Sequence, residues 1–146
     1  FKDDLTKSNY SIGKAQIIRK GNDLTLITYG AMVRVVKDAA EELSEEYNIN
    51  VEVIDLLTIS PMDTELIIES VRNTGRCLIV HEGHKTCGIG SEVCSRIQEH
   101  VFEWLIAPVK RLTAYDLHYP YFQTENYFLP NSSDIINTVT ELMKWE

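Results

Sequence analysis

Residues 76–93 read RCLIVHEGHKTCGIGSEV, and this stretch decides the fold. Its first six residues form a short, mostly apolar run, which is typical of a strand in the buried centre of a parallel sheet. Glycines at positions 83, 88 and 90 then allow a turn, and a helix is expected over residues 90–104. A strand that turns into a helix is the first half of a βαβ unit.

The same alternation of strand and helix runs along the whole chain, which predicts βαβ units with right-handed crossovers. Four strands should run parallel, and the first strand of the chain should be an antiparallel edge strand. The prediction is a three-layer α/β sandwich around a mostly parallel five-stranded sheet. We expect the remaining strands at 15–19, 24–29, 50–55 and 109–114, and the remaining helices at 31–47, 60–74 and 134–145.

Turn residues mark the ends of these elements. Gly21-Asn22-Asp23 lies between the first two strands, where a hairpin loop of three or four residues fits. Ser60 is a suitable N-cap for the helix that follows the third strand, and Pro61 suits its first turn. That helix should end at Asn73-Thr74-Gly75.

Apolar residues recur at helical spacing in three of the helices, which predicts one buried face on each. Glutamates at positions 41, 42, 45 and 46 are expected on the solvated face of the first helix. The expected inward residues are Met32, Val35, Val36, Ala39, Ala40, Leu43 and Tyr47 in the first, Leu66, Ile67, Ile68 and Val71 in the second, and Ile135, Ile136, Val139, Leu142 and Met143 in the last.

Length and composition limit the class of protein. With 146 residues, 44% of them apolar and 25% charged, the chain fits a single globular domain. A net charge of −8 argues against nucleic acid as a partner, because phosphates favour basic surfaces. A membrane partner is not expected either, since no apolar run approaches the roughly 20 residues of a membrane span. Three cysteines without framework spacing indicate reduced thiols in an intracellular compartment.

The domain is expected over residues 13–146, with residues 1–12 as the remnant of an inter-domain linker. The polar start FKDDLTKSNY lacks the apolar segment of a secretory signal. The chain also does not begin with methionine. We therefore expect the chain to be either a fragment or a processed product.

Ligands of folds of this class bind at the carboxyl ends of the strands. Aromatic residues are dense between Tyr115 and Phe128, and they either cover this sheet edge or form a protein interface, where tyrosine and phenylalanine are enriched. The candidate residues for an interface or an anion-binding edge are Gly30, His81, Glu82, Gly83, His84, Gly88, Gly90, Tyr115, Asp116, His118 and Tyr119.

The corner after the central strand invites a metal interpretation. His81, His84 and Cys87 are chemically competent zinc ligands, and Asp116 or His118 can reach in from the neighbouring loop. However, His81 ends the expected strand while the other two lie in a loop, so the side chains need not converge. The coordination requirements of a metal therefore make this interpretation the weaker one.

The glycines of the corner allow two further interpretations. Backbone amides at the start of the next helix can hold a phosphate, although the spacing matches neither a dinucleotide fingerprint nor a P-loop, since Lys85 precedes Gly88 and Gly90. Alternatively, Gly88 and Gly90 let the loop turn and let the helix start pack against the sheet. The spacing alone favours this structural interpretation.

The order of segments resembles one family. The segments are GKAQIIRKGNDLTLITYGAMV at 13–33, VEVIDLLTISPMD at 51–63, TGRCLIVHEGHKTCGIGSEV at 74–93, APVKRLTAYD at 107–116 and YFLPN at 127–131. Together they resemble the carboxyl-terminal domain of the β subunit of thiamine-diphosphate-dependent 2-oxo acid dehydrogenases, a transketolase C-terminal domain. The pyruvate and branched-chain enzymes share this layout.

The resemblance implies a division of labour. In this family, thiamine diphosphate and magnesium sit between an α subunit and the amino-terminal domain of the β subunit, neither of which is in this chain. No catalytic, cofactor-binding or metal-binding residue is therefore carried over. The carboxyl-terminal domain is implied to pair with a second β subunit and to help present the assembly to the basic peripheral subunit-binding domain of the lipoyl acyltransferase.

Two positions depart from the family pattern. Ile106 stands where many relatives have an acidic residue before Ala-Pro, which puts the acyltransferase contact at that spot in doubt. Cys87 stands where relatives often have glycine, so the zinc-like spacing is incidental on this comparison. The expected compartment is by default the bacterial cytoplasm, with the mitochondrial matrix as the alternative. The alternative from a different class is a stand-alone domain that binds a small anion or nucleotide at the carboxyl edge of the sheet.

Overall fold

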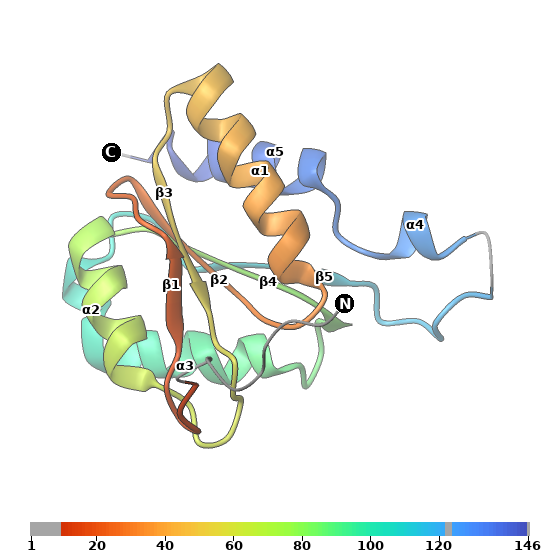
Figure 1. The fold of residues 1–146 in the computed structure, drawn as a ribbon, viewed down its shortest axis with the longest axis horizontal. Coiled ribbons are helices and arrows are strands. Elements are labelled where there is room, and N and C mark those ends of the chain that lie inside the picture. Colours follow the sequence, from red (N-terminus) through yellow and green to blue (C-terminus); the bar gives the residue numbers. More distant parts are fainter. Residues whose placement is uncertain (1–9, 122–123, 146) are drawn as a thin grey trace.

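A computed structural model describes residues 10–121 and 124–145. One five-stranded sheet runs through its centre in the order β1-β3-β2-β4-β5 (Figure 1). The last four strands pair in parallel, while β1 lies antiparallel to β3 at the edge, which confirms the predicted sheet. The strands are β1 (Gln16–Arg19), β2 (Leu24–Thr28), β3 (Val51–Asp55), β4 (Cys77–His84) and β5 (Lys110–Ala114).

Helices cover both faces of the sheet and complete the predicted three layers (Figure 1). On one face lie α1 (Met32–Tyr47) and α5 (Ser132–Leu142), and on the other lie α2 (Thr64–Thr74) and α3 (Ile89–Val101). A short 3-10 helix, η1 (Phe102–Trp104), follows α3, and a short helix, α4 (Glu125–Phe128), lies in the segment after β5. No helix of the described residues is long and apolar enough to cross a membrane.

The alternation of side chains along the strands explains why both faces are covered. In β2, Leu24 and Leu26 pack under α1 and α5, while Ile27 packs under α2 and α3. In β4, Leu78 faces the first group of helices and Ile79 the second. Because successive side chains of a strand point to opposite faces, a strand that is apolar throughout must lie between two layers.

The predicted hairpin between the first two strands is wrong. β1 pairs with β3, and the loop at 21–23 carries the chain past the start of β3 to reach β2. The backbone N–H groups of Asn22 and Asp23 both donate to the carbonyl of Asn50 at 3.0 Å. A hairpin would have occupied one side of β2, whereas β2 uses both sides for parallel pairing with β3 and β4.

The second helix begins later than predicted. Asp63 rather than Ser60 is the N-cap of α2, and its carboxylate accepts from the N–H of Leu66 at 3.4 Å. The same carboxylate accepts from the N–H of Ala15 at 3.1 Å, so it also holds the segment that leads into β1. Asp63 is buried. The local spacing of residues in the sequence could not indicate this burial, because one of the contacts comes from the distant segment before β1.

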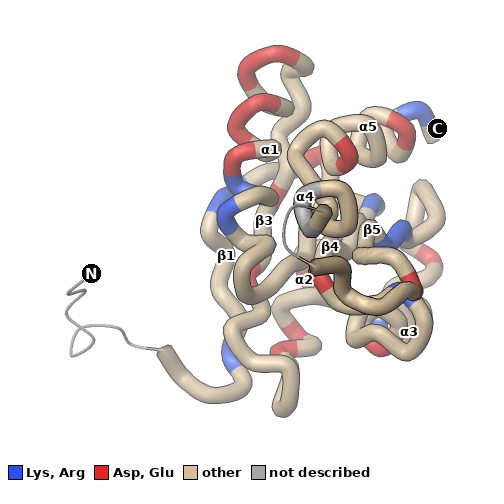
Figure 2. Tube along the Cα trace, turned by 90° about the vertical axis from the view of Figure 1, so that its right-hand side faces the viewer, with Lys and Arg blue, Asp and Glu red and all other residues tan. Residues whose placement is uncertain are grey.

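Burial follows the predicted helix faces closely. The exceptions are Tyr47, which is exposed at the end of α1, and Val35, Leu66, Ile68 and Met143, which are only half-buried. Figure 2 shows acidic residues gathered on the later turns of α1, as expected for a solvated face. Most of the expected linker remnant, residues 1–12, lies outside the described residues.

Candidate functional site

The central strand extends further than its apolar run. β4 continues to His84, and the backbone pairs His81 with Thr113 and His84 with Ala114 of β5, with an irregularity between them. His84 is therefore part of a strand rather than of a loop, contrary to the prediction. The corner, residues 83–90, then leads into α3. Within it, Cys87 is exposed and has a left-handed backbone conformation (φ 57°).

Three glycines of the corner surround the imidazole of His81. A Cβ atom at Gly83 would lie 3.3 Å from the ring Nδ1, and one at Gly88 would lie 2.9 Å from Cε1. At Gly90 it would lie only 2.7 Å from Nε2. The backbone of the corner therefore packs directly against the ring, which is a physical reason for glycine at these positions. At Gly88 a Cβ would also collide with the backbone carbonyl oxygen of His84. This result favours the structural interpretation of Gly88 and Gly90.

The surroundings of His81 disfavour the protonated form of its ring. The side chain is buried, and its ring stacks on that of Tyr29 at the end of β2, with centroids 5.9 Å apart. Burial lowers the pKa of His81, the charge of Arg111 lowers it further, and the backbone of Gly83 opposes the shift. Burial also raises the pKa of Tyr29, with Glu82 adding to that effect.

Two residues from β5 and its end fasten the corner to the sheet. Asp116 accepts from the backbone N–H of Thr86 at 3.0 Å and from its hydroxyl at 2.7 Å. These hydrogen bonds lower the pKa of the Asp116 carboxyl. Arg111 donates to the carbonyl of Lys85 at 3.0 Å and to the hydroxyl of Ser91 at 2.5 Å. The corner and β5 therefore form one connected edge.

The described residues contain no group of three or more His, Cys, Asp or Glu side chains arranged to hold a metal ion. His81 is buried under the glycines while Cys87 is exposed, so these two zinc candidates face different surroundings. Cys77 is fully buried, and burial raises the pKa of its thiol, so it behaves as a small core residue.

The remaining candidates divide into two groups. His84, Asp116 and His118 come together, and with Thr86 and Leu117 they line an open cavity of about 480 Å³. Gly30 is separate from these: it has φ +63° in the turn from β2 to α1, with open space where a Cβ would stand. Glu82 is exposed on β4, beyond the buried part of the strand.

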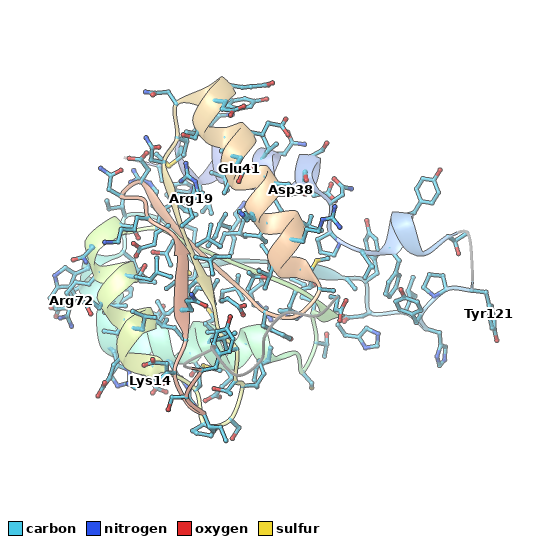
Figure 3. All side chains as sticks on the ribbon, in the orientation of Figure 1. Lys14, Arg19, Asp38, Glu41, Arg72 and Tyr121 are labelled. Atoms are coloured by element: carbon cyan, nitrogen blue, oxygen red, sulfur yellow. The ribbon has the colours of Figure 1, made fainter. Side chains whose placement is uncertain are left out.

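The aromatic segment projects from the body of the molecule. We call residues 115–121 and 124–128 the arm. Tyr115 and Tyr119 pack on Phe128, with ring centroids 6.2 and 5.4 Å apart, and Phe128 is buried between them. Figure 3 shows Tyr121 at the far end of the arm, away from the sheet and helices. Tyr121 is 94% exposed, so it does not cover the sheet edge.

Sequence reasoning missed a second exposed apolar cluster, at the opposite edge of the sheet. Phe102, Trp104 and Ile106 follow α3 and are all exposed. The N–H of Ile106 donates to the carbonyl of Gly75 at 2.8 Å, and the Arg72 guanidinium lies 4.8 Å from the centroid of the Trp104 ring. The available signal in the sequence was a large apolar residue at every second position after the helix.

With this geometry in place, a comparison with protein families matches residues 13–135 to the transketolase C-terminal domain. The chain belongs to this family. The resemblance drawn from the sequence motifs is thereby confirmed. For this transketolase C-terminal domain, the corner and arm described above form the carboxyl edge of the sheet.

Curated relatives agree with this assignment. The domain is 41% identical over 147 residues to the pyruvate dehydrogenase E1 component subunit beta of Staphylococcus aureus, which covers 99% of this chain and 45% of the relative. It is 43% identical over 138 residues to the same-named subunit of Staphylococcus epidermidis, with 93% and 42% covered. The chain thus spans less than half the length of these relatives.

Solved structures share the fold. A split-gene transketolase described as an inactive β4 tetramer superposes with a TM-score of 0.77 at 25% identity, over 95% of this chain and 44% of that one. A 2-oxoglutarate:ferredoxin oxidoreductase from Magnetococcus marinus has a TM-score of 0.59 at 13% identity, over 93% of this chain and 20% of that one, which shows the fold alone.

Proposed function

We propose that this chain is the assembly domain of the β subunit of a 2-oxo acid dehydrogenase. The intact enzyme would decarboxylate a 2-oxo acid oxidatively and transfer the acyl group to lipoamide. The proposed partners are the amino-terminal domain of the same subunit, the α subunit and a second β subunit. Sequence identity of 41% and 43% to two pyruvate dehydrogenase β subunits supports this proposal. The domain alone is expected to be inactive.

The observation that carries the proposal is the exposed arm. More than half of each of five large arm side chains is exposed: Tyr115, Leu117, Tyr119, Tyr121 and Tyr127. Tyr121 lies at the far end of the arm (Figure 3). Tyrosine at this density is typical of protein interfaces, because its ring buries a large area while its hydroxyl keeps a polar contact. The arm therefore suits a surface that is covered in the assembled enzyme.

We propose that thiamine diphosphate and magnesium are held outside this domain, in the interface between the α subunit and the other β domain. The described residues offer no cluster of metal ligands. The His81 ring occupies the space beside the glycines of the corner. Arg111 is likewise engaged by Lys85 and Ser91. These contacts support the assembly role over the anion-binding alternative.

The acyltransferase is the proposed further partner. Its peripheral subunit-binding domain is generally basic, and the net charge of −8 on this chain would attract it. The exposed side chain at position 106 is isoleucine, which offers no charge there. A bacterial cytoplasm is the proposed location, with the mitochondrial matrix as the alternative.

Titration calorimetry with the cognate peripheral subunit-binding domain tests the docking part of the proposal. We expect binding that weakens as the salt concentration rises, because surface charges are screened over about 8 Å at physiological ionic strength. Binding that does not respond to salt would contradict a contact based on charge. A folded chain that does not bind would limit the proposal to subunit pairing.

Substitutions in the arm test subunit pairing. The double variant L117S and Y121S is expected to weaken association with the rest of the enzyme at least tenfold, since large apolar and aromatic side chains that become buried contribute most of the energy of an interface. Analytical ultracentrifugation of the reconstituted α and β components measures it. Tyr47→Ser, which removes an exposed tyrosine from α1 instead, is the matched control and should leave association unchanged.

A further inference from the structure

His81 is a buried titratable side chain that the assembly role does not use. Its exposed fraction is 1%, and neither ring nitrogen has a hydrogen-bond partner among the described residues. A buried polar group without a partner costs free energy, so it calls for an explanation in function or mechanism. The ring lies in the corner that links β4, α3 and the start of the arm.

The surroundings of the ring give a proton on it little compensation, because only the backbone of Gly83 favours the protonated form. Tyr29 of the β2 end stacks flat on one side, and α3 and its preceding turn offer only the backbone of Gly88 and Gly90. The one charged group of β5 that acts on the ring is Arg111, which repels a second positive charge. Within β4, Glu82 is exposed and acts on Tyr29, while His84 is exposed and acts on Asp116.

The corner that closes over this ring also anchors the arm. Thr86 is fastened by two hydrogen bonds to Asp116, and Asp116 is the second residue of the arm. Arg111 holds the carbonyl of Lys85 in the same corner. If the corner moves away from the ring, the base of the arm therefore loses its attachment to β4.

We propose that His81 is a proton-sensitive latch: a proton on its imidazole releases the corner at 83–90 from the ring and loosens the base of the arm. In the closed corner the ring is neutral and packed. In the open corner the imidazolium gains water and moves away from the glycine backbone. The latch is a property of the fold itself and holds whether or not the arm is a subunit interface.

The direction of the pH dependence follows from the closed state. Because the pKa of His81 is lowered in the closed corner, the open form binds the proton more tightly. The corner is therefore stable above the ordinary histidine pKa of about 6.5 and opens more readily as the pH falls below it. The opening equilibrium should rise by up to about tenfold per pH unit until the closed form also titrates.

Amide hydrogen exchange of the segment 83–93, read by mass spectrometry, measures this opening. Between about pH 7.5 and about pH 5.5, after correction for intrinsic exchange chemistry, we expect protection of this segment to fall while that of β2 is retained. In His81→Asn, protection should no longer depend on pH. The matched control His100→Gln, an exposed histidine on α3, should behave like the wild type.

A second measurement guards against a variant that fails to fold. In the wild-type chain, the NMR signals of the His81 ring should remain those of a neutral imidazole below the ordinary histidine pKa of about 6.5 for as long as the corner stays closed. The proposal is overturned if His81 becomes protonated at the ordinary histidine pKa while the corner stays protected. It is equally overturned if the pH dependence survives in His81→Asn or disappears in His84→Gln.

Discussion

Gly90→Val is expected to unfold the corner between β4 and α3. Gly90 is buried, and a Cβ there would lie 2.7 Å from Nε2 and 3.0 Å from Cδ2 of His81, and 3.4 Å from a methyl group of Ile79. Valine adds two further methyl groups at this crowded place. Because packed side chains give way only at a cost, we expect a loss of about 3 kcal/mol, or roughly 10 °C in melting temperature.

Thermal unfolding followed by circular dichroism checks this expectation, together with the oligomeric state. Gly83→Ala is the matched control in the same corner, because its Cβ would lie 3.3 Å from the His81 ring and the ring can shift slightly. The control should cost about 1 kcal/mol or less. A valine variant with the melting temperature and oligomeric state of the wild type would count against the corner as described.

Gly21→Ala, which adds a single methyl group in the loop between β1 and β2, is expected to destabilise the protein strongly. The added Cβ would stand 2.2 Å from the carbonyl carbon of Val51, 2.4 Å from the carbonyl oxygen of Asn50 and 2.5 Å from the nitrogen of Glu52. All three atoms belong to the backbone at the start of β3, so no side chain can rotate away. We expect a loss of about 4 kcal/mol, since the strand itself must shift.

Urea denaturation of Gly21→Ala measures this loss. Asn22→Ala is the control for the same loop, because its side chain is exposed and its change should stay within about 0.5 kcal/mol. Gly30→Ala separates crowding from backbone strain: it has φ +63° but open space around a Cβ, so about 1 kcal/mol is expected. Equal losses for Gly21→Ala and Gly30→Ala would contradict the crowding argument.

Local spacing was enough to predict the layers but not the path of the chain. The β-rich runs and helical periods identify the five strands and the main helices because each pattern depends on neighbours within a few residues. The partner of β1 depends instead on β3, more than thirty residues later, and the glycine-containing turn at 21–23 looks the same in either case. For the same reason Asp63, which joins α2 to the segment before β1, was passed over as an N-cap.

The sequence predicted where the candidate site lies but not the side-chain contacts that form it. The carboxyl edge of the sheet follows from the parallel strands, and the corner and the arm both lie there. That three glycines close over the inward-facing His81 depends on β4 continuing one pair, His84 with Ala114, past the apolar run, which hydrogen bonding to β5 decides. Phe128 as the support of the arm depends equally on a contact across the loop.

Because β1 pairs with β3 and not with β2, the sheet formed by the described residues contains no β-hairpin. Each ladder joins segments separated by a helix or by another strand. No hairpin can therefore act as an early local folding nucleus. The chain must lose the entropy of closing long loops before any pairing of strands stabilises it. On the ribosome, β2 stays without either neighbour until β3 has been made, and the sheet is finished only after β5 emerges.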